Sequence, residues 1–475
     1  MADSSQPEAR NSFDPDAESM RRIGYELIDQ IVEHMSTLSD QRVAKRGSGE
    51  SFAELVDEQM QDGPKGLNDC VNFYFRQVVP GMTRVNHPRF HAFIPCPSSF
   101  PGMVGAMLAA GTNPFVGSWL GGATVASLEL TVLRWIKELL QLDPSCEGIL
   151  TSGGSMANLV GLAAARAKFG DGMLEKGTLY FSGEGHASAE KAALVLGFNK
   201  DNIRVVEVDS EYRMRTQHLE DQIEVDLANG LKPFFVATNA GTTNTGSIDP
   251  LDEVASICKR RDLWFHVDAA YGGFAAMVPE IREQMAGLEL ADSITLDPHK
   301  WLYCPMGVGC AFVREQQYLH AAFSTHGSYL KDLTDDEVNF LERGPELSRP
   351  ARVLPVWMVL RSVGRTELVD QIRADVRLAE HAASLLAEDE RFEVEPVRLS
   401  IAVFRHNPLP GEPEAERAMR DTELIEAILA DGELMLSSTP LNGKSTLRFV
   451  VMNHRTTVED VERSVRRIRE LASPV

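Results

Sequence analysis

Short apolar runs recur along the middle of the chain, and segments long enough to form a helix separate most of them. An apolar run of four to eight residues, bounded by polar or turn residues, is typical of a strand that is buried on both faces. Strands that alternate with helices form a mostly parallel sheet with helices on both faces. We therefore predict an α/β fold with seven strands, at residues 148–151, 178–181, 203–208, 233–238, 263–267, 293–296 and 309–313.

Different patterns flank this region and divide the chain into three parts, residues 1–84, 85–365 and 366–475. Between about residues 16 and 39, apolar residues recur at helical spacing, which predicts an amphipathic helix. Its apolar face packs either on another subunit or on its own domain. Beyond Pro355, helical spacing as far as Leu386 predicts a long connecting helix. The rest predicts a small α+β domain, with strands near 392–395, 399–404 and 447–451 and helices at 422–431 and 458–472.

The composition favours a cytoplasmic enzyme over a protein that binds nucleic acid or membranes. The 475 residues include 47 Lys and Arg against 69 Asp and Glu, which gives a formal net charge of −22. Such a surface repels phosphate backbones and anionic lipids. The polar N-terminus lacks a signal-peptide pattern, and no apolar run is long enough to span a membrane. The six cysteines are scattered without the C-x-x-C pairs of a zinc site, so we expect reduced thiols and no metal.

A lysine and an aspartate at the ends of two predicted strands give the clearest chemical signal. Asp268 follows the strand at 263–267, and Lys300 follows the strand at 293–296. Open α/β sheets bind ligands at the carboxyl ends of their strands. Loss of solvation favours the neutral lysine amine, which can form an imine with an aldehyde, and a carboxylate can keep a pyridine nitrogen protonated. The pair therefore predicts a site for pyridoxal phosphate. The alternative is that each residue belongs to a buried structural ion pair.

Three more polar segments follow predicted strands. Thr151–Asn158 places glycines between a strand and a helix, where backbone N–H groups can bind a single phosphate. It contains neither the G-x-G-x-x-G of dinucleotide sites nor the Gly-Lys-Ser/Thr of a nucleotide P-loop. His186 follows the strand at 178–181, where a histidine can stack on a ring or transfer a proton, or can simply be a loop residue. Thr238–Thr243 is placed to touch the cofactor or the substrate.

Four motifs together resemble those of the group II pyridoxal-phosphate-dependent amino-acid decarboxylases, which include the aromatic-amino-acid, tyrosine, histidine and glutamate decarboxylases. The resemblance covers about residues 88–457 and implies the fold-type I architecture of aspartate aminotransferase. It also implies that an L-amino acid is converted to an amine and CO₂, and that the chain forms a homodimer with active sites at the interface. The motifs are Ser152-Gly-Gly-Ser-Met-Ala-Asn158, Ala240-Gly-Thr-Thr-Asn-Thr-Gly-Ser-Ile-Asp249, His266-Val-Asp-Ala-Ala-Tyr-Gly-Gly273 and Asp297-Pro-His-Lys-Trp301.

The resemblance implies roles for individual residues. Lys300 would hold the cofactor as a Schiff base, Asp268 would pair with its ring nitrogen, and His186 would stack on its ring. Further cofactor contacts, around the phosphate and the ring, are expected from Gly154, Ser155, Thr243, Ala270 and His299. The pocket for the substrate side chain, for which we favour an aromatic amino acid, is expected to include Phe93, Ile94 and Cys96.

The chain departs from the family pattern at two positions. Asp297 stands where several relatives carry asparagine, and an anion near a phosphate is unfavourable unless it points away or meets a donor such as Arg314 or Lys300. Relatives also carry a loop tyrosine that is thought to protonate the carbanion. Counting back from residues 352–357 places Phe340 at that position, within a loop of about 329–349. In plant relatives this exchange accompanies oxidative deamination, so Phe340 is a candidate substrate contact and an aldehyde is the alternative product.

Other classes of protein fit the sequence less well. An aminotransferase would share Lys300 and Asp268 and would hold the substrate carboxylate with an arginine such as Arg448. A non-catalytic relative would be expected to have lost Lys300 or Asp268, and both are present. A nicotinamide oxidoreductase lacks its glycine fingerprint here.

Overall fold

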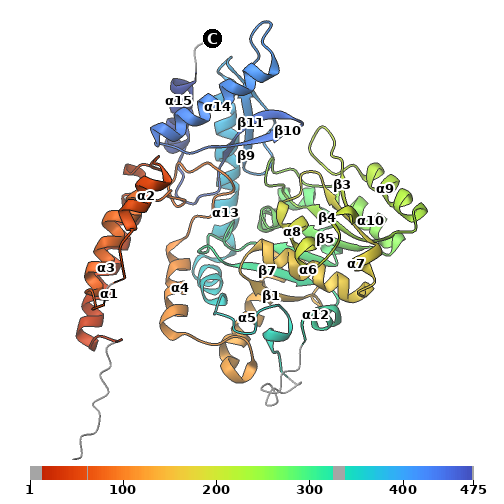
Figure 1. Cartoon of the computed structure of the whole chain (residues 1–475), viewed down its shortest axis with the longest axis horizontal. Helices are drawn as coiled ribbons and strands as arrows, with labels where there is room; N and C mark the ends of the chain where they lie inside the picture. The colour runs from red at the N-terminus through yellow and green to blue at the C-terminus, as the bar shows by residue number, and fades with distance from the viewer. Residues whose placement is uncertain (1–12, 61, 325–336, 473–475) are drawn as a thin grey trace, which may run out of the picture.

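A seven-stranded sheet forms the centre of the large domain (Figure 1). The computed structural model describes residues 13–60, 62–324 and 337–472. The strand order is β1-β7-β6-β5-β4-β2-β3, and β7 runs antiparallel to both neighbours while β2 to β6 run parallel. The seven predicted strands are confirmed to within two residues at each end, as β1 (Glu147–Thr151), β2 (Gly177–Ser182), β3 (Ile203–Val206), β4 (Lys232–Asn239), β5 (Trp264–Asp268), β6 (Ser293–Leu296) and β7 (Gly309–Val313).

Helices cover both faces of this sheet. Every residue of β2, β5, β6 and β7 is buried, and successive strand residues point to opposite faces, so neither face is open to solvent. Helix α6 contacts the central strands closely, because a Cβ on Gly161 would lie 2.8 Å from His266 Nδ1. The helices of this domain are α4 (Phe100–Thr112), α5 (Trp119–Leu140), α6 (Gly154–Phe169), α7 (Met173–Lys176), α8 (Ala187–Val195), α9 (Thr216–Ala228), α10 (Leu251–Arg261), α11 (Pro279–Arg282) and α12 (Gln316–Phe323).

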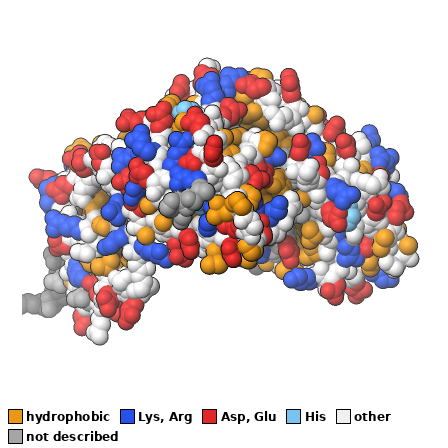
Figure 2. All heavy atoms as spheres, turned by 90° about the horizontal axis from the view of Figure 1, so that it is seen from above, with side chains coloured by type: hydrophobic (Ala, Val, Ile, Leu, Met, Phe, Trp, Pro, Cys, Tyr) orange, Lys and Arg blue, Asp and Glu red, His pale blue; other side chains and the backbone are white. Residues whose placement is uncertain are grey.

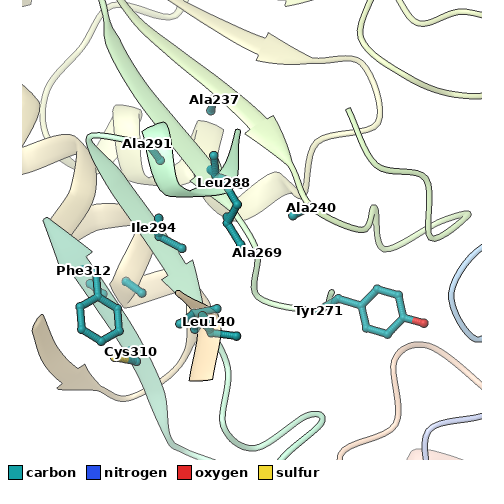
Figure 3. Close-up of a cluster of buried hydrophobic side chains, with 14 of the residues drawn as sticks. Leu140, Ala237, Ala240, Ala269, Tyr271, Leu288, Ala291, Ile294, Cys310 and Phe312 are labelled. Carbon is teal, nitrogen blue, oxygen red and sulfur yellow. The ribbon is translucent and has the colours of Figure 1, made fainter. Parts of the chain in front are cut away.

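The apolar core lies between the sheet and these helices. Figure 3 shows part of it, where Ile294 of β6 and Phe312 of β7 pack among small and branched side chains. Tyr271 points away from this cluster in the same view, and its hydroxyl lies 2.8 Å from Ser400 Oγ in the C-terminal part of the chain. Tyr271 therefore connects the segment after β5 to the small domain.

The small domain is a four-stranded antiparallel sheet with order β10-β11-β9-β8, covered by helices. The predicted α+β composition is confirmed, although strand β10 and the first half of helix α14 were not predicted. Helix α13 has non-helical backbone at Gly364, with φ 82°, a conformation that glycine adopts without strain. The elements are α13 (Val353–Ala387), β8 (Phe392–Val394), β9 (Ile401–His406), α14 (Glu414–Asp431), β10 (Ser437–Leu441), β11 (Lys444–Val450) and α15 (Val458–Leu471).

The N-terminal segment forms an arm of three helices, which stands to one side of the rest of the chain in Figure 1. The predicted amphipathic helix is present as α1 (Ala17–Ser36), and α2 (Gly49–Val56) and α3 (Leu67–Phe73) follow it. None of these three helices contains a buried residue in the single chain. The apolar residues Ile23, Leu27, Ile28 and Ile31 of α1 are only partly buried in the single chain.

Acidic and basic side chains lie interspersed over the face shown in Figure 2, without a continuous basic patch. Across residues 13–60, 62–324 and 337–472, no helix combines the length and the apolar character that a membrane crossing requires.

Candidate active site

The predicted cofactor residues meet in one cavity of about 280 Å³ at the carboxyl ends of the central parallel strands. All eight of them line its wall, although they come from five separate stretches of the chain. They are Gly154, Ser155, His186, Thr243, Asp268, Ala270, His299 and Lys300. Parallel strands bring these stretches together because their carboxyl ends share one edge of the sheet.

Lys300 lies in a turn that follows β6. Its backbone N–H donates to the Asp297 carbonyl at 2.9 Å, and its Nζ lies 3.1 Å from Asp297 Oδ2. The Lys300 side chain is 15% exposed, so the amine is largely removed from solvent while it still lines the cavity. A lysine amine in this position can react with a carbonyl group of a bound molecule.

Asp268 is the last residue of β5 and is 8% exposed. Its Oδ2 accepts a hydrogen bond from Asn158 Nδ2 at 2.8 Å, and its Oδ1 accepts one from the Ala270 backbone N–H at 3.1 Å. In the described part of the chain, Asp268 forms no ion pair with a lysine, arginine or histidine. A buried carboxylate without a cationic partner suits a ligand that carries its own positive charge, such as a pyridinium.

The turn between β1 and α6 forms the opposite wall. Gly153 has φ 145°, in the region that favours glycine. A Cβ on Gly309 would lie 2.4 Å from the carbonyl carbon of Gly153, so β7 approaches this turn closely. A Cβ on Gly154 would lie 2.9 Å from Asp297 Oδ2 and 3.2 Å from Ala270 Cβ, so any larger residue would narrow the cavity between Gly154 and these two residues. The first N–H groups of α6 point out of the helix at this turn, which is the arrangement that binds a phosphate.

His186 is the N-cap residue of α8 and is solvent-exposed in the cavity wall. Its Nδ1 accepts a hydrogen bond from the Ser188 backbone N–H at 3.2 Å and lies 2.7 Å from Ser188 Oγ. The imidazole is therefore fixed at one nitrogen, and the remainder of the ring can contact a bound ring.

Asp297 is buried within this wall, and its position answers the question raised by the family pattern. Its Oδ2 contacts Lys300 Nζ and lies 3.6 Å from His299 Nε2, while its Oδ1 has no hydrogen-bond partner. The other donor considered, Arg314, instead donates to backbone carbonyls of Glu289 and Ala291. The carboxylate thus faces the lysine and lies beside the turn between β1 and α6.

The predicted substrate residues lie outside this cavity. Phe93 is 58% exposed, and Ile94 packs against the core. Cys96 lines a second hollow, of about 660 Å³, between the body of the chain and the N-terminal arm. Burial raises the pKa of the Cys96 thiol to about 11, so it is not a reactive thiolate at neutral pH.

Phe340, the fourth predicted substrate contact, does not line this cavity either. Phe340 is fully buried, and the guanidinium groups of Arg343 and Arg349 lie 5.6 and 4.8 Å from its ring centre. It begins a short 3₁₀ turn, Phe340–Glu342, whose Leu341 N–H donates to the Gly117 carbonyl. The preceding part of the predicted loop, residues 329–336, lies outside the described residues.

The guanidinium of Arg448 forms hydrogen bonds within the protein and is not free to bind a substrate carboxylate. Its guanidinium donates to the carbonyls of Asn244, Thr243 and Phe93 and to Ser437 Oγ, and burial lowers its pKa to about 10. It therefore connects β11 of the small domain to loops of the large domain. This removes the main argument for an aminotransferase.

Eight further residues of the cavity wall were not named individually as site residues, although most of them lie in the polar segments or motifs that the sequence analysis singled out. They are Ser152, Gly153, Met156, Ser188, Asn239, Gly241, Tyr271 and Asp297. Asn158, which contacts Asp268, was also not predicted, although it closes the glycine motif that we had singled out. Its role was hidden because Asp268 lies 110 residues further along the chain.

Comparison with known proteins identifies the family. The family model described as the pyridoxal-dependent decarboxylase conserved domain matches residues 50–406, and the chain belongs to this family. The aromatic-L-amino-acid decarboxylase of Bacillus atrophaeus is 37% identical over 97% of this chain and 96% of its own length. The phenylacetaldehyde synthase of Arabidopsis thaliana is 33% identical over 96% of each chain. The crystal structure of Oryza sativa TDC with PLP and tryptamine has a TM-score of 0.93 and 27% identity, and the match covers 97% of this chain and 99% of that one.

The cavity fits the cofactor of this family. The carboxylate of Asp268, which has no cationic partner among the described residues, is suited to a protonated ring nitrogen. The glycine turn at Gly154 has room for a phosphate, and the amine of Lys300 can react with an aldehyde, so the three features fit pyridoxal phosphate. The protein is thus a pyridoxal-phosphate-dependent carboxy-lyase that acts on an amino acid, and the predicted fold-type I architecture is confirmed.

Proposed function

We propose that the protein decarboxylates an aromatic L-amino acid to the corresponding amine and CO₂. The single observation that supports these site assignments best is the meeting of all eight predicted cofactor residues in one cavity. When bound, pyridoxal phosphate supplies a protonated ring that accepts the electron pair left by the departing CO₂. The protein supplies orientation, exclusion of water and control of charge around that ring.

The residues divide this work among them. Lys300 would hold the cofactor through its amine, and Asp297 can stabilise the lysine whenever it is protonated because the two groups are 3.1 Å apart. Asp268 would keep the ring nitrogen cationic. The N–H groups at Gly154 and Ser155 would bind the phosphate, together with His299, and His186 would cover one face of the ring.

The preference for an aromatic substrate rests on the relatives. The Bacillus atrophaeus protein is named as an aromatic-L-amino-acid decarboxylase, and the Oryza sativa structure contains tryptamine, an aromatic amine. Both matches extend over nearly the whole chain, so the surroundings of the cavity are shared as well as its wall.

We also propose that the active form is a cytoplasmic homodimer. The arm exposes large apolar side chains, including Tyr25 at 70% and Leu67 at 53% exposure, and a second copy of the chain is the partner that would cover them. All six cysteines are unpaired, which suits a reducing compartment.

An amine is the expected product. The case for an aldehyde relied on Phe340 taking the place of a proton-donating tyrosine in the active site, whereas Phe340 is fully buried away from the cavity. Because one relative is named as a phenylacetaldehyde synthase, the aldehyde is the alternative product that the experiment must measure.

The experiment is a measurement of CO₂, amine, aldehyde and peroxide from purified enzyme with pyridoxal phosphate and a panel of aromatic, imidazole and acidic amino acids. We expect equal amounts of CO₂ and amine from an aromatic substrate. Lys300→Ala should lower turnover by at least about 10³-fold, because the group that holds the cofactor is removed. Lys259→Ala, at the end of the surface helix α10, is the matched control. Aldehyde and peroxide as main products, or full activity in Lys300→Ala, would refute the proposal.

A further inference from the structure

A chain of buried hydrogen bonds runs behind the cavity and meets at Asn158. On one side, Trp264 Nε1 donates to Ser293 Oγ at 2.8 Å, and Ser293 Oγ lies 2.7 Å from His266 Nδ1. His266 Nε2 lies 2.9 Å from Asn158 Oδ1. The exposed fraction of all four residues is 2% or less, so water does not compete for these contacts.

On the other side, the Asn158 amide branches to two residues of the cavity wall. Its Nδ2 donates to Asp268 Oδ2 at 2.8 Å and to Ser188 Oγ at 2.9 Å. Ser188 Oγ lies 2.7 Å from His186 Nδ1. One side chain thus joins the partner of the ring nitrogen to the residue that covers the ring.

Asp268 at one end of this chain of contacts and Trp264 at the other determine which atom donates in each of these hydrogen bonds. An ionised Asp268 only accepts hydrogen bonds, so the Asn158 amide nitrogen must face it and the amide oxygen must face His266. His266 therefore donates from Nε2. Burial lowers the pKa of His266 to about 4, so the ring is neutral at pH 7 and its Nδ1 accepts the hydroxyl proton of Ser293. Trp264, a donor only, completes the set from the far end.

The same logic fixes the tautomer of His186. Asn158 donates to Ser188 Oγ, so the Ser188 hydroxyl proton is free to go to His186 Nδ1. The Ser188 backbone N–H also donates to that nitrogen. With Nδ1 accepting both bonds, a neutral His186 carries its proton on Nε2.

We propose that Asn158 is the positioning residue of this active site, which orients Asp268 toward the ring nitrogen and fixes His186 in the Nε2–H form through Ser188. The inference rests on the proposed roles of Asp268 and His186. Gly161 makes the arrangement possible, because the absence of its Cβ lets α6 approach His266 closely enough for Asn158, one turn earlier, to reach β5.

The first test needs no variant. Nitrogen-15 NMR of histidine-labelled wild-type enzyme without cofactor, with the His186 signal assigned through His186→Gln, should show His186 protonated on Nε2. Protonation on Nδ1 would overturn the proposal. Since this measurement needs neither cofactor nor turnover, its outcome is independent of the proposed reaction.

The second test compares Asn158→Leu with Asn202→Leu. Asn202 is also buried and donates one hydrogen bond, to the Glu175 carbonyl at 3.0 Å, but it does not line the cavity. In Asn158→Leu we expect kcat to fall about 10- to 100-fold, the effect of losing one hydrogen bond to a charged group, with a smaller change in KM. The ring-nitrogen signal of ¹⁵N-labelled pyridoxal phosphate should shift toward the unprotonated form, and the His186 signal should show both tautomers.

Asn158→Asp separates positioning from packing. It keeps the acceptor for His266 but places a second carboxylate against Asp268, so it should weaken cofactor binding more than Asn158→Leu does. Equal behaviour of Asn158→Leu and Asn202→Leu in all readouts would overturn the proposal. Wild-type enzyme that binds pyridoxal phosphate but releases no CO₂ would instead overturn the proposed function and leave the tautomer result standing.

Discussion

At the scale of single residues, the cavity was predictable where residue type and strand position coincide. Lys300 and Asp268 each follow an apolar run. A charged side chain at the end of a buried strand is costly unless it has a partner or a ligand, so both residues indicated a site. Asn158 gave no such signal, since an asparagine after a glycine turn is ordinary and two of its three partners, His266 and Asp268, lie more than 100 residues away. Phe340 was placed by counting residues through a loop, and a loop has no periodicity from which that alignment could be checked.

Asp297 offers a direct test of charge near the phosphate-binding turn. The carboxylate of Asp297 lies beside Gly154, where the phosphate is proposed to bind, so it should repel the phosphate. Asp297→Asn removes this negative charge, and pyridoxal phosphate should therefore bind about three- to ten-fold more tightly. Pyridoxal, which lacks the phosphate, should gain less. Titration of apoenzyme with both compounds measures the difference, and Asp262→Asn, at an exposed carboxylate, should change neither affinity. Equal gains for the two compounds would contradict this account of Asp297.

Phe340→Tyr should affect stability rather than product. The ring is fully buried between two arginines, so an added hydroxyl has no solvent and must find a partner in a packed core. We expect the free energy of unfolding to fall by about 1–3 kcal/mol, measured with urea, while the ratio of amine to aldehyde stays at the wild-type value. A change in that ratio at unchanged stability would restore Phe340 to the active site.

At the scale of elements, the sheet followed from its apolar runs because buried parallel strands have a simple pattern. The antiparallel direction of β7 did not follow, since strand direction depends on the connection and not on composition. Strand β10 was missed because it alternates buried and exposed residues over only five positions, with Pro440 among them.

Helix α13 supports the turn that carries Lys300. Asp375 of this helix accepts hydrogen bonds from Tyr303 Oη at 2.8 Å and Gln371 Nε2 at 3.0 Å, and burial raises its pKa from 3.8 to about 7. Tyr303 in turn donates its N–H to the Lys300 carbonyl. A buried carboxyl group on one helix is thus linked through Tyr303 to the turn that carries Lys300.

This raised pKa predicts a pH dependence of stability. Between about pH 4 and 7 the folded state keeps a proton on Asp375 that the unfolded state releases, so the free energy of unfolding falls as pH rises. The shift corresponds to roughly 4 kcal/mol over that range. Urea unfolding at several pH values should show a smaller decline in Asp375→Asn than in wild type. Asp370→Asn, exposed on the same helix, should decline as wild type does; an unchanged slope in Asp375→Asn would contradict the prediction.

At the scale of the whole molecule, the three-helix arm was only partly predictable. Helical periodicity indicated α1, but the sequence left open what covers its apolar face, because periodicity says nothing about the partner. In the structure no residue of α1, α2 or α3 is fully buried, and the apolar face of α1 is only partly covered by the same chain. The part of this face that stays exposed is available to a second molecule.

The proposed dimer predicts a mass of twice 52.4 kDa, about 105 kDa, in sedimentation or light scattering. Tyr25→Glu combined with Leu67→Glu places charges on the exposed apolar face and should shift the protein toward monomer, with loss of activity. Asp29→Arg changes the charge on an exposed polar position of the same helix and should leave the dimer intact. A wild-type monomer with full turnover would refute the dimer.

Arg448 has an effect that extends beyond its own domain. Its guanidinium ties a strand near the C-terminus to the carbonyls of Thr243 and Asn244, at the rim of the cavity. Random mutagenesis should therefore recover inactive clones with lesions in β11, whose purified proteins remain folded but hold the cofactor loosely. In such clones the defect would arise from the loss of the Arg448 hydrogen bonds that hold the loop at Thr243 in place, since no side chain that lines the cavity has changed.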